Sequence, residues 1–450
     1  MLFYNLNKPS EKVDFRTATI RGLGSEKGLF FPERIPEFPA SWINNLENIS
    51  DEEIAWTIMK AYVGESIPEP ILRQITTETI AFDIPLVPVS EGIYTLELFH
   101  GPTLAFKDVG ARFMSRCLGY FMEQESRPVT VLVATSGDTG GAVASGFLGV
   151  KGVEVVILYP SGKVSEVQEL QLTTPGKNIK TLEVKGSFDD CQALVKQAFS
   201  DEELNNHIFL TSANSINVAR WLPQQIYYFL AWKQWKPKDK PPVISVPSGN
   251  FGNICAGLLA RQSGLPVTHF IAACNINAVI PEFLQTGIYR PVEAKPSLSN
   301  AMDVGDPSNF VRILALFDAE ITSLRAVMSS ESISDQETGA AIEALYRLNH
   351  YQADPHGAVG WLALSRWLKN HPGQQGIFLE TAHPVKFPST VEKFTGTPVP
   401  IPPSVELLYL QKKHSRSMDR DYEGFKKYLL DFSAAGELPA MRVKTEQFLI

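Results

Sequence analysis

The sequence predicts an α/β fold with open, mostly parallel sheets in two subdomains flanked by helices, together with a helical N-terminal domain. From Ile93 onward, short β-branched runs alternate with helical stretches, which is typical of parallel sheets covered by helices. Before that point, helical periodicity and proline-rich connections dominate. A chain of 450 residues with 44% hydrophobic content can bury a large core. We therefore expect at least two domains.

The chain is expected to divide into three parts. Residues 1–95 form an N-terminal, mainly helical domain, since Ser50 and Glu53 have the spacing of a capping box before an amphipathic run. Residues 96–385 form the central region with two α/β subdomains, of which the smaller covers about 125–215. Residues 386–450 form a peripheral C-terminal segment that includes a helix near 422–432.

Short apolar runs in the central region predict the strands of the two sheets. In open α/β sheets, ligands bind at the loops that follow strand ends, so residues just after these runs are candidates for a site. A polar, proline-broken linker at 236–242 separates the earlier strands from the later ones. The predicted strands are residues 129–134, 153–158, 179–184, 208–210, 243–246, 268–273 and 376–379.

Lys107 is the first residue that points to chemistry. It lies in the stretch LFHGPTLAFKDVGARFM, after a Gly-Pro-Thr turn and at the expected start of a helix. An amine packed against Phe106 and Leu104 loses hydration, so its pKa falls and the neutral, nucleophilic form becomes accessible near neutral pH. For a single lysine, the more common role is a surface ion pair, here with Asp108. Two loops further along the chain favour the chemical role.

These two loops share the pattern SG[DN]xG and each connects a strand to a helix. Residues 136–140 read SGDTG after the strand 129–134, and residues 248–252 read SGNFG after the strand 243–246. Glycines let backbone N–H groups approach a ligand, and a helix N-terminus adds partial positive charge. One such turn is a weak signal. Two of them, with a shielded lysine, indicate a ligand with two anionic groups or two anionic ligands.

The Lys107 segment and several further motifs resemble the threonine synthase family, whose members are pyridoxal-phosphate enzymes of the tryptophan-synthase-β fold type (fold type II). The similarity covers nearly the whole chain, includes the N-terminal stretch FRTATIRGLGSEKGLFFPERIP, and keeps the family's motif order. It implies a carbon-oxygen lyase of threonine biosynthesis that uses pyridoxal 5′-phosphate, bound in the central region, to convert O-phospho-L-homoserine and water to L-threonine and phosphate. The other motifs are TSGDTGGAVA, SANSINVARWLPQ, PSGNFGN, AMDVGDPSNFVR and ETAHPVKFP.

The resemblance also implies roles for individual residues. Lys107 would attach the cofactor aldehyde and then, once freed, move protons at Cα and neighbouring carbons of the substrate. Thr381 would meet the pyridine nitrogen, although a threonine that caps a strand end is an alternative. Asp138 would lie near the ring hydroxyl, where related enzymes often carry asparagine. A carboxylate beside a substrate carboxylate is repulsive unless it is otherwise bonded, so the role of Asp138 stays open. The cradle for the cofactor phosphate would comprise Gly249, Asn250, Phe251, Gly252 and Asn253.

Substrate binding would use the first glycine loop and some positive charge for the phosphate that leaves. The loop residues Thr135, Ser136, Gly137 and Thr139 offer hydroxyls and backbone amides to the substrate carboxylate. Lys163 and Arg112 are the residues that we predict to bind the substrate phosphate. Any of the basic residues could equally form a surface ion pair. The remaining candidates are Arg220 and Lys386, with Ser161 and Asn214 as neutral donors.

Other classes of function are less well supported by the sequence. A phospho-lyase that releases 2-oxobutyrate would share every motif, because it differs only in how the intermediate is protected. A non-catalytic binding protein on the same fold is disfavoured by the intact lysine and loops. A P-loop protein is disfavoured because neither loop contains GxxxxGK[ST]. His356 and His383 lie in proline-containing turns and are not taken as catalytic, and no cluster suggests a metal.

Composition restricts partners and location. A formal net charge of −8 without a basic cluster argues against nucleic acid as a partner. No apolar run is long enough for a membrane span, and the N-terminus lacks the apolar core of a signal peptide. We expect a cytoplasmic protein, while the oligomeric state stays open. The four cysteines show no CxxC pair and are expected to be thiols in a reducing compartment; they are Cys117, Cys191, Cys255 and Cys274.

Overall fold

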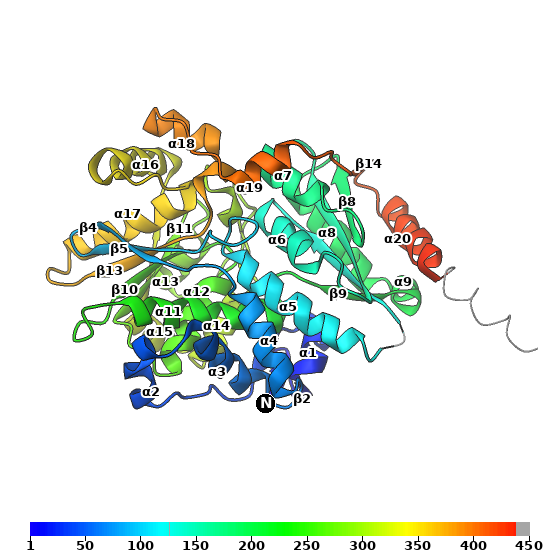
Figure 1. The fold of residues 1–450 in the computed structure, drawn as a ribbon, viewed down its shortest axis with the longest axis horizontal. Helices are drawn as coiled ribbons and strands as arrows, with labels where there is room; N and C mark the ends of the chain where they lie inside the picture. The colour runs from blue at the N-terminus through cyan, green and yellow to red at the C-terminus, as the bar shows by residue number, and fades with distance from the viewer. Residues whose placement is uncertain (126, 438–450) are drawn as a thin grey trace, which may run out of the picture.

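The computed structural model describes residues 1–125 and 127–437, which form three β-sheets surrounded by helices (Figure 1). A six-stranded sheet occupies the left half of the view and a five-stranded sheet the right half. The N-terminal helices cover the lower side of both. This arrangement confirms the predicted α/β class with two sheet-containing subdomains.

The N-terminal part combines helices with a small antiparallel sheet of order β2-β1-β3. The predicted helix start is confirmed, since the Ser50 hydroxyl accepts a hydrogen bond from the Glu53 amide at 3.3 Å. The small sheet was not predicted as strands, because its longest member, KPSEKVD, is too polar to show hydrophobic alternation. The elements are β1 (Leu2–Asn5), β2 (Lys8–Asp14), α1 (Phe15–Arg21), η1 (Ser25–Lys27), β3 (Phe30–Pro32), α2 (Ala40–Asn44), η2 (Leu46–Asn48), α3 (Asp51–Val63) and α4 (Glu69–Thr79).

The larger sheet has the order β12-β11-β10-β13-β5-β4, and all neighbours are parallel except β4 and β5. The β4–β5 hairpin spans the expected domain boundary at residue 95, so the chain joins this sheet from Leu86. Its strands are β4 (Leu86–Ser90), β5 (Ile93–Glu97), β10 (Val243–Pro247), β11 (His269–Cys274), β12 (Met328–Ser332) and β13 (Gly376–Glu380).

Further helices lie between these strands in the chain. They are α5 (Lys107–Met122), α10 (Val218–Trp221), η3 (Leu222–Gln224), α11 (Gln225–Gln234), α12 (Gly252–Gln262), α13 (Val279–Thr286), η4 (Asn300–Met302), α14 (Phe310–Leu316), α15 (Ile321–Val327), α16 (Asp335–Asn349) and α17 (Pro355–Lys369). Among them, α12, α13, α15 and α17 contact strands of this sheet.

The smaller sheet has the order β14-β8-β7-β6-β9 and is parallel throughout. Its edge strand β14 comes from the C-terminal segment, and α20 packs against α8 and α9 of this subdomain. Residues 438–450 of that segment lie outside the described residues. The elements of this subdomain are β6 (Val129–Ala134), α6 (Asp138–Phe147), β7 (Val153–Pro160), α7 (Glu166–Thr173), β8 (Ile179–Val184), α8 (Phe188–Ser200), α9 (Glu202–His207), β9 (Phe209–Ser212), β14 (Arg416–Met418) and α20 (Tyr422–Glu437). Between β13 and β14 the chain forms η5 (Pro384–Lys386), α18 (Pro388–Thr395) and α19 (Pro403–Tyr409), of which α18 packs against α16 and α19 against α7.

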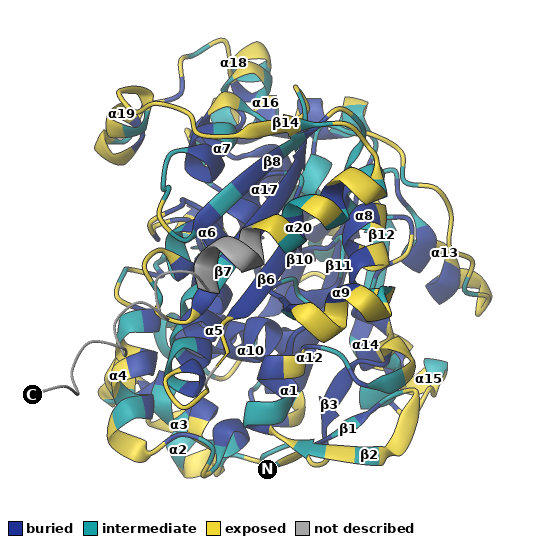
Figure 2. Ribbon diagram, turned by 90° about the vertical axis from the view of Figure 1, so that its right-hand side faces the viewer, coloured by how far each residue is buried: buried dark blue, intermediate teal, exposed yellow. Residues whose placement is uncertain are grey.

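The central strands of both sheets are buried on both faces, as Figure 2 shows for β6 and β10. This burial explains why they appear in the sequence as continuous apolar runs rather than alternating ones. Each of the predicted strands matches a strand to within two residues at either end. The division of the chain at residues 95 and 385 stays a prediction.

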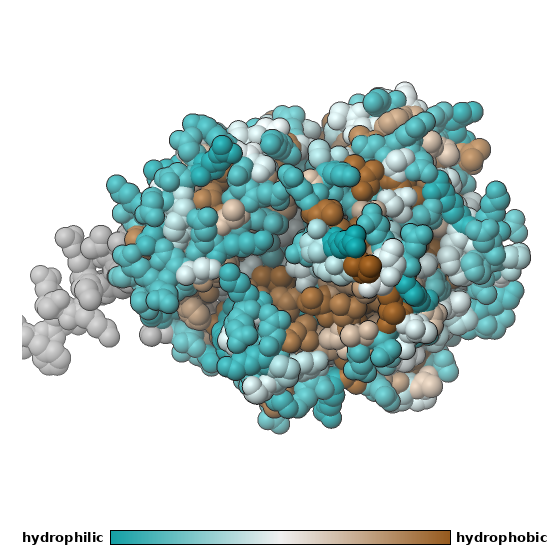
Figure 3. Space-filling view, turned by 180° about the vertical axis from the view of Figure 1, so that it is seen from behind, coloured by the Kyte–Doolittle hydropathy of each residue, from teal (hydrophilic) through white to brown (hydrophobic). Residues whose placement is uncertain are grey.

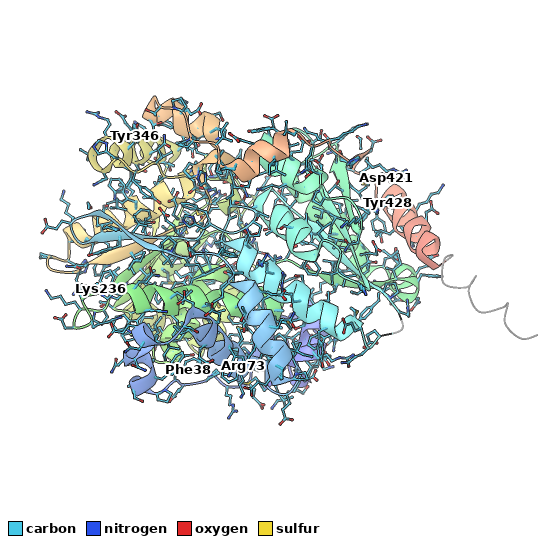
Figure 4. The ribbon with its side chains drawn as sticks, viewed as in Figure 1. Phe38, Arg73, Lys236, Tyr346, Asp421 and Tyr428 are labelled. Atoms are coloured by element: carbon cyan, nitrogen blue, oxygen red, sulfur yellow. The ribbon has the colours of Figure 1, made fainter. Side chains whose placement is uncertain are left out.

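The surface is mixed in character. Seen from behind, it is mostly hydrophilic with a hydrophobic stretch across its middle (Figure 3). In the part of the chain that the structure describes, no helix has the length and apolarity needed to cross a membrane. The linker at 236–242 lies at one end of the molecule, where Lys236 is labelled in Figure 4, and Asp421 and Tyr428 mark α20 at the other.

Candidate active site

A cavity opens where the two subdomains meet, and most of the residues predicted for the site line it. Lys107 lies at the first turn of α5, the residues from Thr135 follow β6, the loop from Gly249 follows β10, and Thr381 follows β13. All three strands end at this place, as expected for an open α/β sheet. The cavity is lined by Lys107, Thr135, Ser136, Asp138, Thr139, Asn214, Ser215, Arg220, Gly249, Asn250, Phe251, Gly252, Asn253, His356 and Thr381, among others.

Backbone hydrogen bonds hold Lys107 next to Thr381. The Phe106 amide donates to the Thr381 carbonyl at 2.9 Å, and the His383 amide donates to the Leu104 carbonyl at 3.0 Å. Leu104 has a φ of 58°, a strained backbone for a non-glycine residue, which turns the chain into α5. Strained positions of this kind are common at functional sites.

Asp108 is not the partner of Lys107. Its carboxylate accepts hydrogen bonds from the Thr103 hydroxyl at 2.6 Å and the Thr103 amide at 2.9 Å, which closes the Gly-Pro-Thr turn. The surface ion pair considered from the sequence is therefore not formed. Lys107 is left facing the cavity, with its Nζ 5.5 Å from the centroid of the Phe106 ring.

The environment of Lys107 makes the neutral amine more accessible than it is for an ordinary lysine. Burial lowers its pKa to about 8, nearby Arg220 and Lys386 lower it as well, and the Asp138 carboxylate partly opposes them. The ordinary pKa of a lysine is about 10.4, so a much larger fraction of this amine is uncharged at neutral pH. The side chain thus has the property that a nucleophilic lysine needs.

This pKa gives a test by pH. The rate at which cofactor-free protein captures pyridoxal phosphate should rise with pH and level off above an apparent pKa of about 8, because only the neutral amine attacks an aldehyde. In Asp138→Asn the midpoint should move to lower pH, because a carboxylate that stabilises the charged amine has been removed. Stopped-flow absorbance over pH 6.5–9.5 measures this. A midpoint near 10 would contradict the assignment.

Asp138 forms a buried ion pair that compensates its charge. Lys386, whose side chain is 0% exposed, forms an ion pair with Asp138 Oδ1 at 2.8 Å and donates to the Thr103 carbonyl at 2.8 Å. Gln168 Nε2 also donates to Asp138 Oδ1, at 2.9 Å. Burial alone would raise the pKa of Asp138, but Lys386 and Lys107 outweigh it and hold the pKa well below its usual range. The carboxylate is therefore charged but compensated.

The loop from Gly249 to Asn253 is shaped as a close-fitting cradle. A Cβ on Gly249 would lie 2.7 Å from Met302 Cα, so only glycine fits there. Phe251 adopts the left-handed conformation with a φ of 60°, and α12 begins at the next residue. Asn253 donates to the Pro247 carbonyl at 2.8 Å, which ties the loop to the end of β10. The loop thus presents backbone N–H groups at a helix N-terminus, as an anion site requires.

Substitution of Gly252 tests whether this cradle holds the cofactor phosphate. A Cβ on Gly252 would meet its nearest neighbours at 3.4 Å, an ordinary contact. Gly252→Ala should therefore change the free energy of unfolding of cofactor-free protein by less than about 0.5 kcal/mol. We expect cofactor affinity to fall about tenfold, or about 1.4 kcal/mol, since the methyl group would stand where the phosphate approaches. Equilibrium titration of cofactor measures this. Gly249→Ala, in contrast, should destabilise the protein by about 1–3 kcal/mol.

Arg220 and Asn214 line the same cavity, and each has a buried side-chain atom without a partner. Arg220 is buried and donates through Nη1 to the Ala213 carbonyl, but its Nε has no partner. The Asn214 Oδ1 is also without a partner. Burial lowers the pKa of Arg220 to about 10, and the guanidinium remains charged at neutral pH. Buried polar atoms without partners at a cavity are typical of a ligand site.

The structure does not bring every predicted residue to the cavity. Arg112 donates to the Glu78 carbonyl from Nε at 2.9 Å and from Nη2 at 2.5 Å. Lys163 is exposed beyond β7, and Ser161 donates to Glu183 at 2.5 Å. Gly137 forms the turn of the first loop with a φ of 135°, but it does not line the cavity. Proximity to Lys107 along α5 was a poor guide for Arg112, because its side chain leaves the helix on the face toward α4.

His356 also lines the cavity, although its proline-containing turn indicated a structural role. Its Nδ1 lies 2.5 Å from Asp354 Oδ2, and its Nε2 accepts a hydrogen bond from the Ala301 amide at 3.2 Å. The preceding Asp354, two positions away in DPHG, was a signal that could have found it. His383, in contrast, accepts a hydrogen bond from the Val385 amide and stabilises the turn that contains Lys386. Burial lowers the pKa of His383 to about 4.

These residues fit pyridoxal phosphate. The cavity supplies a lysine with a lowered pKa, a glycine cradle that excludes a Cβ at Gly249, and a hydroxyl at Thr381. Within residues 1–125 and 127–437, no group of three or more metal-ligating side chains comes together.

Family models match almost the entire chain. The model for pyridoxal-phosphate dependent enzymes covers residues 83–377, that for the threonine synthase N terminus covers 3–80, and that for the threonine synthase C-terminal region covers 357–429. A threonine synthase from Serratia marcescens is 43% identical over 435 residues, which is 96% of this chain and 100% of the relative.

Solved structures agree with these matches. The crystal structure of threonine synthase from Escherichia coli superposes with a TM-score of 0.90 at 43% identity, covering 96% of this chain and 100% of that one. A threonine synthase from Brucella melitensis, solved with pyridoxal phosphate bound, gives a TM-score of 0.89 at 32% identity, covering 96% and 99%. The chain therefore belongs to the threonine synthase family and is a pyridoxal-phosphate-dependent enzyme.

Proposed function

We propose that the enzyme converts O-phospho-L-homoserine and water to L-threonine and inorganic phosphate, with Lys107 as the catalytic base. The observation that supports this most directly is the cavity lined together by a lysine of lowered pKa, two glycine loops and the buried cation Arg220. In the reaction, the bond between Cγ and the phosphate oxygen breaks, and one proton is lost from Cβ while one is added at Cγ. Water supplies a hydroxyl to Cβ, and its remaining proton goes to the phosphate that leaves. One phosphate leaves for each water consumed.

Lys107 moves the protons. Bound pyridoxal phosphate supplies an electron sink that stabilises negative charge on the carbons next to the substrate amine. Lys107 would remove protons from Cα and Cβ and deliver protons to Cγ and back to Cα, since its lowered pKa of about 8 makes the neutral amine accessible. Thr381 would offer a neutral hydroxyl to the ring nitrogen. The Gly249–Asn253 loop would hold the cofactor phosphate, and helix α12, which begins in this loop, would contribute its N-terminal partial charge.

The first glycine loop orients the substrate carboxylate. Thr135 Oγ1 accepts hydrogen bonds from the Gly137 and Gly140 amides at 2.9 Å, so this hydroxyl fixes the loop. The donors that remain for the carboxylate are the hydroxyls of Ser136 and Thr139 and the amides at the start of α6. Asp138 does not oppose binding, because Lys386 compensates its charge. We assign it to the ring hydroxyl side of the cofactor.

Arg220 receives the substrate phosphate in place of Arg112 and Lys163, and Asn214 offers its amide Nδ2 as a neutral donor. Arg220→Gln should raise KM about 10- to 150-fold, because a charge-assisted hydrogen bond contributes about 1.5–3 kcal/mol. Steady-state kinetics with O-phospho-L-homoserine measures this effect. Lys163→Gln is the matched control, and its kinetics should equal those of the wild type. An unchanged KM in Arg220→Gln would place the phosphate elsewhere.

Product analysis tests the reaction as a whole. Protein loaded with pyridoxal phosphate is mixed with O-phospho-L-homoserine, and phosphate, threonine and 2-oxobutyrate are quantified over time. Phosphate matched by threonine supports the proposal. Phosphate matched by 2-oxobutyrate would identify a phospho-lyase, and absence of all three would refute the substrate.

We further place the enzyme in the cytoplasm. All four cysteines are buried and unpaired, as is typical of proteins in a reducing compartment.

A further inference from the structure

Arg312 on α14 is a buried cation with only neutral partners. Its side chain is 0% exposed, and Nε and Nη2 donate to the Phe30 carbonyl at 3.2 and 3.1 Å. Nη1 donates to the Ser215 carbonyl at 3.1 Å, and Nη2 to the Ile216 carbonyl at 2.5 Å. No carboxylate among the described residues forms an ion pair with it, and burial lowers its pKa to about 9. A buried charge without an ionic partner lowers the stability of the folded protein, so a functional reason for the position of Arg312 is expected.

Asn309 extends this contact to the second glycine loop. Arg312 Nη1 donates to Asn309 Oδ1 at 2.6 Å, which leaves Asn309 Nδ2 to donate to Ser215 Oγ at 3.0 Å. The Asn309 backbone amide donates to the Asn250 carbonyl at 3.2 Å. Ser215 and Asn250 both line the cavity, one on each of the loops assigned to a phosphate. One guanidinium therefore links the two loops through a single asparagine.

We propose that Arg312 is a positioning residue that fixes the separation of the loop 214–216 from the loop 249–253 and thereby sets the spacing of the two phosphates. It touches neither ligand. In the protein alone its partners are neutral acceptors and the Trp221 ring, whose centroid lies 4.7 Å from the guanidinium carbon, so we infer that anions bound at the two loops and the order of this network stabilise each other. The inference rests on the proposed function, because that function places a phosphate at each loop.

The planar fork of arginine is essential to this role. Five N–H groups in fixed directions reach acceptors from three separate segments, whereas a lysine ammonium has three donors at one point. Arg312→Lys keeps the charge and loses the fork. We expect KM for O-phospho-L-homoserine and the dissociation constant of inorganic phosphate to rise at least tenfold, with kcat within about threefold of wild type, because the reacting groups on Lys107 are untouched.

Arg325→Lys is the matched control. Arg325 also donates to backbone carbonyls, those of Leu284 at 2.7 Å and Gln285 at 3.3 Å, but it lies outside the cavity. This variant should leave KM and the phosphate constant unchanged. If Arg312→Lys lowers the melting temperature and leaves both constants at their wild-type values, Arg312 is merely structural and the proposal fails.

If Arg312→Lys does not fold, the variant Asn309→Asp tests the same proposal. An aspartate at 309 gives the buried arginine a carboxylate partner and removes the donor to Ser215. The melting temperature should therefore stay level or rise, while KM and the phosphate constant rise at least tenfold. Unchanged constants would overturn the proposal. Calorimetry measures the binding of inorganic phosphate to cofactor-loaded protein without turnover. This binding can be measured even if product analysis shows that no threonine is formed. Failure of the inference about Arg312 can therefore be distinguished from failure of the proposed function.

Discussion

Lys107→Ala should lose at least about 10⁴-fold in kcat, because general base catalysis alone contributes 10²–10⁴-fold and the covalent attachment of the cofactor is lost with it. Threonine formation is the readout. The protein should still fold, since Lys107 makes no hydrogen bond that holds α5 in place and its backbone contacts are unaffected. Cofactor should remain associated through the Gly249–Asn253 loop, but borohydride reduction should no longer fix it to the chain, as peptide mass would show.

Two further lysine variants serve as controls for Lys107→Ala. Lys107→Arg retains positive charge but offers no nucleophilic amine at neutral pH, so it should be as inactive as the alanine variant. Lys163→Ala removes an exposed lysine outside the cavity and should keep full activity. Appreciable threonine formation by Lys107→Ala, above one hundredth of the wild-type rate, would show that another residue supplies the base.

Lys386→Met should destabilise the protein by about 3–5 kcal/mol, because it leaves the Asp138 carboxylate buried without its partner. Both side chains are inaccessible, with Lys386 0% and Asp138 4% exposed, so solvent cannot replace the lost contact. Chemical denaturation of the cofactor-free protein measures the change. The double variant Asp138→Asn, Lys386→Met removes both charges and should recover much of the lost stability. If Lys386→Met destabilised the protein only through lost packing at position 386, the double variant would recover no stability.

The same pair makes stability depend on pH. Lys386 and Lys107 hold the pKa of Asp138 below its usual range despite burial, so the stabilisation is present above the ordinary aspartate pKa of about 3.9 and is lost as pH falls toward the lower folded value. In Lys386→Met, less stability should be lost as the pH falls, because Lys386 no longer lowers the pKa of Asp138. The variant should also shift cofactor capture to higher pH, since Lys386 lowers the pKa of Lys107.

The sequence by itself determined the local elements of this enzyme. The buried strands, the helix start at Ser50, the glycine loops after β6 and β10, and Lys107 at a helix start all follow from short-range patterns. Such patterns act within a few residues, which is why strand bounds agree to within two residues. Resemblance to the threonine synthase family added the cofactor and the substrate.

The tertiary structure alone decided which basic residues reach the cavity. Arg112 and Lys163 lie near site residues in sequence, yet their side chains lie outside the cavity, while Arg220 reaches it from α10. Lys386 proved to be the partner of Asp138, across a sequence separation that no local pattern spans. The direction of a long side chain depends on the face of its helix and on the packing of distant segments. Arg312, in AMDVGDPSNFVR, shows the same limit: its role depends on carbonyl groups from Phe30, Ser215 and Ile216, which only folding brings together.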